Sequence, residues 1–385
     1  MAKTSSIAVF DDVRRALVLQ RMAVPSLQVG EILVRVSMCT LCGSDLHTFT
    51  GRRSCCGSTI LGHEVIGRIE AIADGTERVD YRGKPLNLGG RVTWAVAVGC
   101  GTCFYCQRNL PQKCERLVKY GHEPLKTSRH LRGGLSEYCV LASGTSVFTL
   151  PDDLPDEAAC PANCATATVA GALRVGEMQP GETVLIQGAG MLGLTAAAMA
   201  SARGASKVIV TDPDVRRLKL AEAFGATDLI PIGEDGRTMV ASVRAATEGR
   251  GADLAIELSG TPAAMERSPD SVRIGGRCVF VGAVFPDRAL SIDGEQIVRR
   301  MLTLRGLHNY HPDDLGVALD FLAANHRRFP LASLVTGEFN LQQVQQAFEH
   351  AIQSNAVRVA VRMESDPLRT KPIEPASVAG RAGED

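Results

Sequence analysis

The stretch Val184-Leu-Ile-Gln-Gly188-Ala-Gly190-Met-Leu-Gly193 decides the fold. An apolar run typical of a buried strand precedes three glycines spaced G-x-G-x-x-G, and a helical pattern follows over Met191–Arg203. In this context Gly188 allows a tight turn, Gly190 lets the backbone approach a pyrophosphate, and Gly193 lets helix and strand pack closely. The alternative is an ordinary run of helix-packing glycines. We predict a dinucleotide-binding turn at a helix N-terminus, with contacts from Gly188, Gly190, Met191, Leu192 and Gly193.

The chain beyond this turn alternates strands with helices. Strands are expected at Lys207–Thr211, Leu254–Leu258 and Cys278–Val281, with a helix at Arg216–Phe224. Such alternation is typical of a parallel sheet with crossover helices. We therefore predict a doubly wound Rossmann domain over residues 164–305.

Asp212 and Arg217 bear on the choice of dinucleotide. Asp212 follows the second strand, about twenty residues after the last glycine of the turn. A carboxylate there accepts from ribose hydroxyls and repels a 2′-phosphate, which favours NAD over NADP. Arg217 lies near the adenosine end and weakens that preference.

The segments flanking this domain are expected to form a second one. Before residue 156 the pattern is β-rich, with strands at Ala16–Val36 (turn at Gly30), Val65–Ala73 and Gly90–Val98. After Arg305 come helical stretches at Asp313–Ala324 and Leu341–Gln353 and a strand at Ala356–Val361. We predict a catalytic domain made of residues 1–163 and 306–365. Residues 366–385, rich in Pro, Ala, Gly and charge, are expected to form a flexible tail.

Composition excludes several classes of protein. A chain of 385 residues with 45% hydrophobic and 4% aromatic residues fits two α/β domains. Lys+Arg and Asp+Glu both number 42, so the basic excess of a nucleic-acid-binding protein is missing. The most apolar helical run, Leu192–Ala202, is too short to cross a membrane. Residues Met1–Phe10 do not resemble a signal peptide, and we expect a cytoplasmic protein.

Four of the twelve cysteines are spaced C-x2-C-x2-C-x7-C, at Cys100, Cys103, Cys106 and Cys114. Four thiolates close a tetrahedron around zinc with no open position, which makes a structural site. An iron–sulfur cluster would have a different last spacing and a following proline, and a redox pair would need only two thiols. A zinc ribbon that binds nucleic acid would need a basic surface. We predict structural zinc.

A second set of candidate zinc ligands is scattered along the chain. Cys42, His63 and Cys164 would leave zinc a fourth position for water or substrate, the arrangement of a catalytic site. Taken singly, a buried cysteine is usually a small hydrophobic residue, and a histidine is more often structural than a ligand.

Together these motifs resemble the zinc-containing medium-chain dehydrogenase/reductase family of alcohol and polyol dehydrogenases. The motifs are C-G-S-D-L-H at residues 42–47, G-H-E at 62–64, the four-cysteine spacing and the glycine turn, in the family's order. The resemblance covers about residues 16–362. It implies a GroES-like catalytic domain, two zinc ions per chain, NAD, and a homodimer or homotetramer that acts on a small molecule.

The resemblance also implies roles for single residues. Cys42, His63 and Cys164 would hold the catalytic zinc; Cys160 is a rival for Cys164, which is preferred because Thr168 matches a threonine beside the nicotinamide. Asp45 would be the carboxylate that orients the ligand imidazole. Ser44 would take the substrate's proton, and His47 would be the base that passes it on. Glu64 would approach the metal, and Arg358 would lie near the pyrophosphate.

Two arginines give an indication of the substrate. Arg52 and Arg53 follow a glycine at which the family's substrate pocket begins, and guanidinium groups suit phosphate, phosphonate or carboxylate. Alternatively they meet solvent or the cofactor phosphates. With Leu307-His308-Asn309-Tyr310-His311, they resemble a narrower branch of alcohol dehydrogenases associated with phosphonate catabolism.

We therefore expect a zinc-dependent, NAD-linked oxidoreductase acting on a small alcohol or aldehyde, an anionic one included. A polyol dehydrogenase is the near alternative. Zinc-free quinone or enoyl reductases of the superfamily lack both cysteine sets. A non-enzymatic zinc-binding structural module would have no need of Cys42, Ser44 and His63.

Overall fold

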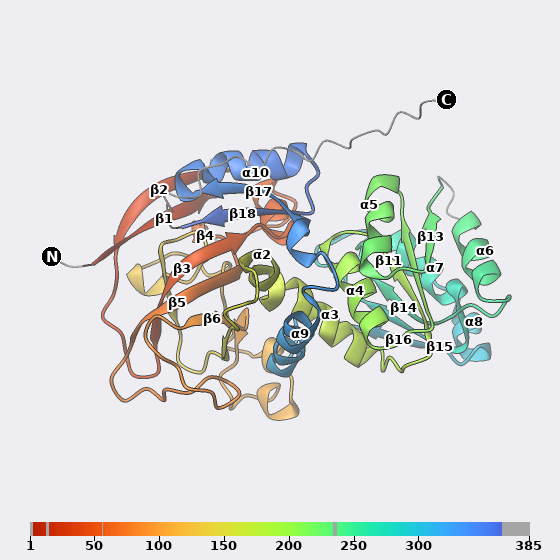
Figure 1. Cartoon of the computed structure of the whole chain (residues 1–385), viewed down its shortest axis with the longest axis horizontal. Helices are drawn as coiled ribbons and strands as arrows, with labels where there is room; N and C mark the ends of the chain where they lie inside the picture. The colour runs from red at the N-terminus through yellow and green to blue at the C-terminus, as the bar shows by residue number, and fades with distance from the viewer. Residues whose placement is uncertain (1–2, 13–14, 56, 234–236, 364–385) are drawn as a thin grey trace.

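The computed structural model describes residues 3–12, 15–55, 57–233 and 237–363, and the predicted tail at 366–385 lies outside this range. Figure 1 shows two lobes side by side. The first lobe combines the beginning and the end of the chain, and the second lobe is built from its middle. The predicted fold class is confirmed: a β-rich GroES-like lobe and a parallel-sheet Rossmann lobe.

The second lobe is a six-stranded sheet in the order β13-β12-β11-β14-β15-β16, and every pair in it is parallel. The crevice of such a sheet opens at the carboxyl ends of its strands, between β11 and β14, where the strand order reverses. The strands are β11 (Thr183–Gln187), β12 (Lys207–Asp212), β13 (Asp228–Pro231), β14 (Ala252–Glu257), β15 (Val272–Phe280) and β16 (Thr303–Gly306). The helices are α4 (Met191–Ala202), α5 (Val215–Leu220), α6 (Arg237–Ala246), α7 (Pro262–Ser271) and α8 (Gly294–Arg299).

The first lobe holds the remaining sheets. Its largest has the order β10-β6-β5-β3-β18-β17, with β9 also pairing β3, so the last strands of the chain lie beside one of the first. The strands are β1 (Thr4–Asp11), β2 (Ala16–Ala23), β3 (Ile32–Thr40), β4 (Thr59–Ile60), β5 (Glu64–Ile72), β6 (Arg91–Trp94), β7 (Ala97–Val98), β8 (Val118–Lys119), β9 (Tyr138–Leu141), β10 (Val147–Thr149), β17 (Val335–Asn340) and β18 (Arg358–Arg362). Helices α1 (Gly43–Phe49) and α10 (Val344–Gln353) belong to the same lobe.

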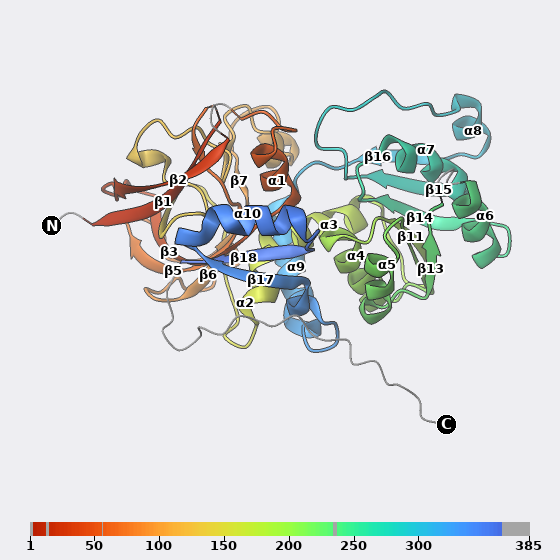
Figure 2. The ribbon, with the colours of Figure 1, turned by 90° about the horizontal axis from the view of Figure 1, so that it is seen from above.

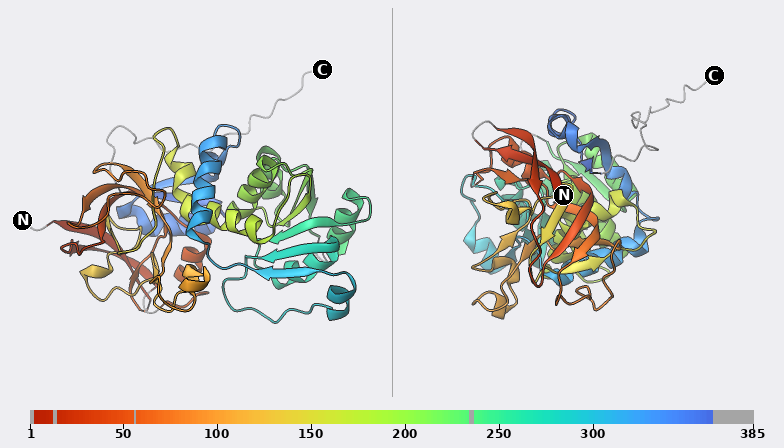
Figure 3. Two further views of the ribbon diagram at one scale, coloured as in Figure 1. Left: turned by 90° about the horizontal axis from the view of Figure 1, so that it is seen from below. Right: turned by 90° about the vertical axis from the view of Figure 1, so that its left-hand side faces the viewer.

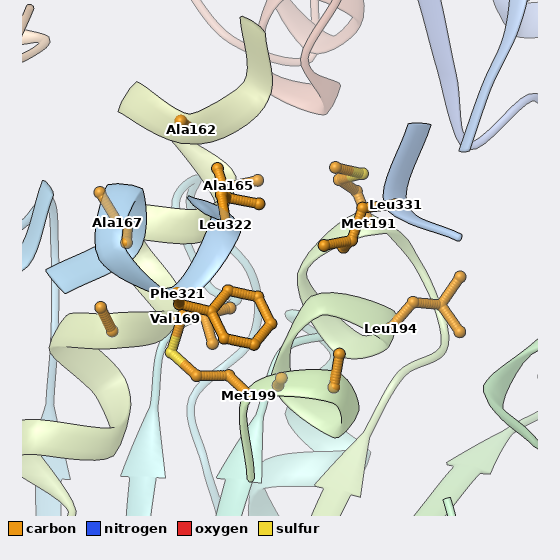
Figure 4. Close-up of a cluster of buried hydrophobic side chains, with 14 of the residues drawn as sticks. Ala162, Ala165, Ala167, Val169, Met191, Leu194, Met199, Phe321, Leu322 and Leu331 are labelled. Atoms are coloured by element: carbon orange, nitrogen blue, oxygen red, sulfur yellow. The ribbon is translucent and has the colours of Figure 1, made fainter. Parts of the chain in front are cut away.

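Three helices join the lobes: α2 (Asp156–Ala159), α3 (Ala165–Val175) and α9 (Pro312–Asn325). The left view of Figure 3 shows α9 standing between the two lobes. Its side chains Phe321 and Leu322 pack with α3 and α4 in one buried cluster (Figure 4). Shared burial of this kind holds the two lobes in one geometry, which a site between them requires.

Two expectations about elements need correction. The helix expected at Arg216–Phe224 is α5 followed by a 3₁₀ turn over Ala221–Phe224, which ends at Gly225 in the left-handed region. The strand expected at Gly90–Val98 is divided into β6 and β7. Among the described residues, no helix is both long enough and apolar enough to cross a bilayer.

Candidate active site

A cleft of about 460 Å³ lies between the two lobes. The first lobe contributes α1, the turn before β5, and the residues around β8; the second contributes the glycine turn and the loops after β14 and β15. Figure 2 shows the loop between β15 and α8 reaching toward α1, and the rings of Phe285 and His47 meet edge to face at 4.7 Å. Most of the residues predicted to carry the chemistry line this one cavity.

The C-G-S-D-L-H motif forms the first turn of α1. Cys42 is the residue before the helix, and its backbone N–H donates to Asp45 Oδ2 at 2.9 Å. A carboxylate at the third helical position caps the helix, which explains why the motif begins a helix here. The cap leaves the Cys42 thiol, Ser44 and His47 facing the cleft.

His63 lies in the turn before β5. Gly62 has a φ of +88°, and a Cβ there would come within 2.5 Å of Cys39 Sγ, so this position requires glycine. Asp45 Oδ1 accepts from the Gly62 N–H and lies 3.3 Å from His63 Nδ1, without the alignment of a full hydrogen bond. A carboxylate in this position would favour a proton on Nδ1 and leave Nε2 free for a metal.

The ligand atoms of Cys42, His63 and Cys164 all lie within 4.8 Å of one another. The two sulfurs are 3.9 Å apart, and zinc–sulfur bonds of about 2.3 Å in a tetrahedron require about 3.8 Å. Cys160 instead buries its thiol against the carbonyls of Met38 and Glu64. The donor set therefore fits zinc with Cys164 and not with its rival.

Arg358 and Glu64 form a buried ion pair behind this donor set. Arg358 Nε and Nη2 donate to Glu64 Oε2 and Oε1, each at 2.8 Å, and the Thr40 hydroxyl donates to the same carboxylate at 2.6 Å. Arg358 Nη2 is also 3.6 Å from Cys42 Sγ. A hydrogen bond with Cys164, opposed by burial and aided by Arg358, holds the pKa of Cys42 well below its usual range, which favours the thiolate a metal needs.

Three further predicted residues surround the donor set. Ser44 Oγ is 3.5 Å from His63 Nε2, and Thr168 lines the cleft one helical turn after Cys164. Burial, Arg52 and Arg53 lower the pKa of His47, so its imidazole is neutral and can act as a base.

The predicted dinucleotide turn faces the same cleft. Gly188 has a φ of +105°, and a Cβ on Gly190 would meet nothing within 4 Å, so the backbone is open to a pyrophosphate. A Cβ on Gly193 would stand 1.8 Å from the Gly188 carbonyl oxygen. Met191 and Leu192 also line the cavity. The residues therefore fit a dinucleotide at the N-terminus of α4.

Asp212 and Arg217 lie near the turn but outside the cavity lining. The Asp212 carboxylate accepts from the N–H groups of Ala189 and Asp214, at 2.6 and 2.8 Å. Arg217 donates to the carbonyl and the side chain of Asn355. Each Asp212 oxygen keeps a lone pair for a ribose hydroxyl.

Cys100, Cys103, Cys106 and Cys114 form the second donor set, in the loop between β7 and β8. Their sulfurs lie within 4.8 Å of one another, with Cys103 and Cys114 3.8 Å apart. The N–H groups of Cys100 and Arg116 donate to the Cys114 sulfur at 3.2 and 3.3 Å. Such bonds stabilise a thiolate, so this set fits a closed tetrahedral zinc site.

Arg52 and Arg53 line the cleft, and sequence reasoning missed several of their neighbours. Lys119 and His122 come from the segment after the four cysteines, and no motif distinguishes them from surface residues. The segment 307–310 also lines the cleft, while His311 turns away and caps α9.

Comparisons with known proteins agree with this geometry. Residues 28–152 match the family model "Alcohol dehydrogenase GroES-like domain", and residues 192–324 match "Zinc-binding dehydrogenase". The chain is 30% identical to sorbitol dehydrogenase of Bacillus subtilis, over 88% of this chain and 91% of that protein. It is 28% identical to L-threonine 3-dehydrogenase of Aeromonas salmonicida, over 84% and 90%. An alcohol dehydrogenase structure from Thermotoga maritima matches with a TM-score of 0.86 at 28% identity, over 94% and 100%.

Proposed function

Because the chain belongs to the zinc-dependent alcohol dehydrogenase family, we propose that it transfers a hydride between NAD and a small alcohol or aldehyde that bears an anionic group. Zinc and a nicotinamide dinucleotide are the cofactors of this family, typically with two zinc ions per chain. The expected assembly is a homodimer or homotetramer.

One observation carries the proposal: an open donor set and a dinucleotide turn face the same cleft. An alcohol held at the donor set and a nicotinamide held beside Thr168 would be neighbours, as direct hydride transfer requires. A structural zinc module would need neither feature.

The chain's own residues account for binding and proton movement. Zinc held by Cys42, His63 and Cys164 would act as a Lewis acid toward the alcohol oxygen, and the nicotinamide would accept the hydride. Ser44, beside the ligand imidazole, would take the hydroxyl proton. His47, neutral in the cleft, would then carry that proton toward solvent.

A panel of substrates tests the proposal. Zinc-loaded enzyme should reduce NAD with phosphonate- and phosphate-bearing alcohols and should do so more slowly with neutral alcohols of equal length. The polyol alternative has the support of the similarity to a sorbitol dehydrogenase. Faster turnover of sorbitol than of any anionic alcohol would favour it instead.

Replacing Asp212 should alter the choice of dinucleotide. The wild type should prefer NAD, and Asp212→Ala should narrow the preference because the repulsion of a 2′-phosphate is removed. Asp212→Asn removes the charge and keeps one oxygen for the Ala189 N–H, but it loses the acceptor for the Asp214 N–H, so thermal unfolding of both variants checks for loss of structure. Steady-state kinetics with both cofactors measure the ratio. A wild type that already prefers NADP would contradict the role of Asp212.

Replacing Arg53 should lower kcat/KM for anionic alcohols much more than for neutral ones. A charge-assisted contact contributes roughly 1.5–3 kcal/mol, so Arg53→Ala should lower kcat/KM on an anionic alcohol by about one to two powers of ten. A neutral alcohol makes no such contact, and its kcat/KM should barely change. An equal loss on both substrates would place the arginine on the cofactor or in the fold.

A further inference from the structure

One wall of the cleft presents hydrogen-bond donors that have few acceptors. Its side chains are Arg53, Lys119, His308 and Asn309, from the loop after α1, from β8, and from the segment between β16 and α9. Among the residues that the structure describes, no carboxylate lies at ion-pair distance from Arg53 or from Lys119. Among the described residues, Asp287 is the one Asp or Glu that lines the cleft; it is exposed, and its Oδ1 accepts from the N–H of Arg288.

Lys119 is the partly buried charge of this wall. Its Nζ donates to Asn309 Oδ1 at 3.3 Å, and an ammonium has two further N–H donors. Burial and the nearby Arg53 lower the pKa of Lys119 to about 8. A partly buried ammonium without an anionic partner is costly, which indicates that a ligand supplies the partner.

Asn309 gives a second, independent indication. Its φ of +57° is left-handed, a conformation that asparagine tolerates, and its side chain bridges Lys119 and the cleft. Its amide Nδ2 is buried and has no acceptor in the described part of the chain. Buried donors in folded proteins almost always have a partner, so an acceptor atom is expected here when the cleft is filled.

His308 adds a neutral donor. Its Nδ1 lies 2.6 Å from Lys113 Nζ, and an ammonium can only donate, so Nδ1 accepts and the ring proton resides on Nε2. Burial together with Lys119 and Lys113 lowers the pKa of His308 to about 4, which keeps the ring neutral.

We propose that Lys119, Asn309 and His308, together with Arg53, bind a tetrahedral oxyanion of the substrate, a phosphonate or phosphate group. The assignment rests on the proposed function and identifies the residues that would select the substrate. Donors on three separate segments suit a group with three oxygens, whereas a planar carboxylate offers two. Arg52 is exposed, and Arg53 is only partly so, which makes Arg53 the arginine of this site.

Binding measured without turnover tests this assignment. Titration calorimetry of zinc-loaded enzyme with propylphosphonate should give saturable binding, and butyrate should bind more weakly. Lys119→Met should weaken propylphosphonate binding by about tenfold or more, because a charge-assisted contact is lost. Asn309→Gly, which suits the left-handed backbone, should weaken it about fivefold. Lys84→Met, at an exposed lysine, should bind like the wild type. Circular dichroism and thermal unfolding would report whether each variant is folded.

The outcomes separate this assignment from the proposed function. No binding of propylphosphonate, or equal binding of butyrate, overturns the oxyanion site while leaving NAD-linked oxidation of neutral alcohols intact. A loss of NADH affinity in Lys119→Met equal to its loss of propylphosphonate affinity would assign the wall to the cofactor phosphates. Conversely, propylphosphonate binding in an enzyme that oxidises no alcohol would overturn the proposed function and retain the site.

Discussion

Replacing Cys42 with alanine should remove one of two zinc ions per chain and lower turnover by about three powers of ten or more. Cys42 is one of three donors in the open set, and two donors hold zinc poorly. The four cysteines between β7 and β8 form a separate set and should keep their ion. Elemental analysis of purified protein, combined with NAD-linked kinetics, measures both effects.

Cys278→Ala is the matched control for Cys42→Ala. Cys278 is buried in β15 and belongs to neither donor set, so this variant should keep both zinc ions and full turnover. A wild type that holds a single zinc ion would refute the two-site interpretation. A Cys42→Ala enzyme with normal turnover would refute the catalytic role of the open set.

Replacing Gly193 with alanine should damage the dinucleotide site through the backbone. The new Cβ would stand 1.8 Å from the Gly188 carbonyl oxygen, a separation that no rotamer change can relieve. The helix α4 must then move away from β11, which costs about 1–3 kcal/mol of overpacking and displaces the amides that would meet the pyrophosphate. We expect NADH affinity to fall by at least about tenfold.

Gly294→Ala is the control for Gly193→Ala. A Cβ there meets nothing within 4 Å, and Gly294 lies outside the cleft. Fluorescence titration with NADH and thermal unfolding should show no change in this variant. If Gly193→Ala also binds NADH with wild-type affinity, the turn is not the cofactor site.

The parts that could be predicted from the sequence are those with a fixed local spacing. The glycine turn and the four-cysteine loop each lie within a few residues, and the backbone conformation they need restricts the residue types. Cys42, His63 and Cys164 are far apart in the chain, and only the resemblance to a family predicted that they form one site. Physical reasoning from periodicity alone could not have joined them.

Other parts left no local signal. Helix α3 is buried on nearly every face, so its alanine-rich sequence lacks the alternation of polar and apolar residues that marks a surface helix. Lys119 belongs to a short strand, and only the tertiary fold brings it to the same wall of the cleft as Arg53, whereas Asn309 lies in the segment 307–311 that a resemblance had already singled out. A single lysine in such a strand is usually solvated, so no spacing rule would select Lys119.

The pairing of β18 with β3 determines the order in which the two lobes can fold during synthesis. Residues of the second lobe are contiguous, so that lobe can fold as soon as it has emerged. The first lobe cannot, because 294 residues separate Glu64 from Arg358, the cation that its buried carboxylate requires. At about 5–20 residues per second, translation leaves Glu64 without this partner, and the Met38–Thr40 edge of β3 unpaired, for about 15 to 60 seconds. The nascent chain thus carries an unpaired strand edge through most of its synthesis, and such an edge can pair with other chains until β18 covers it.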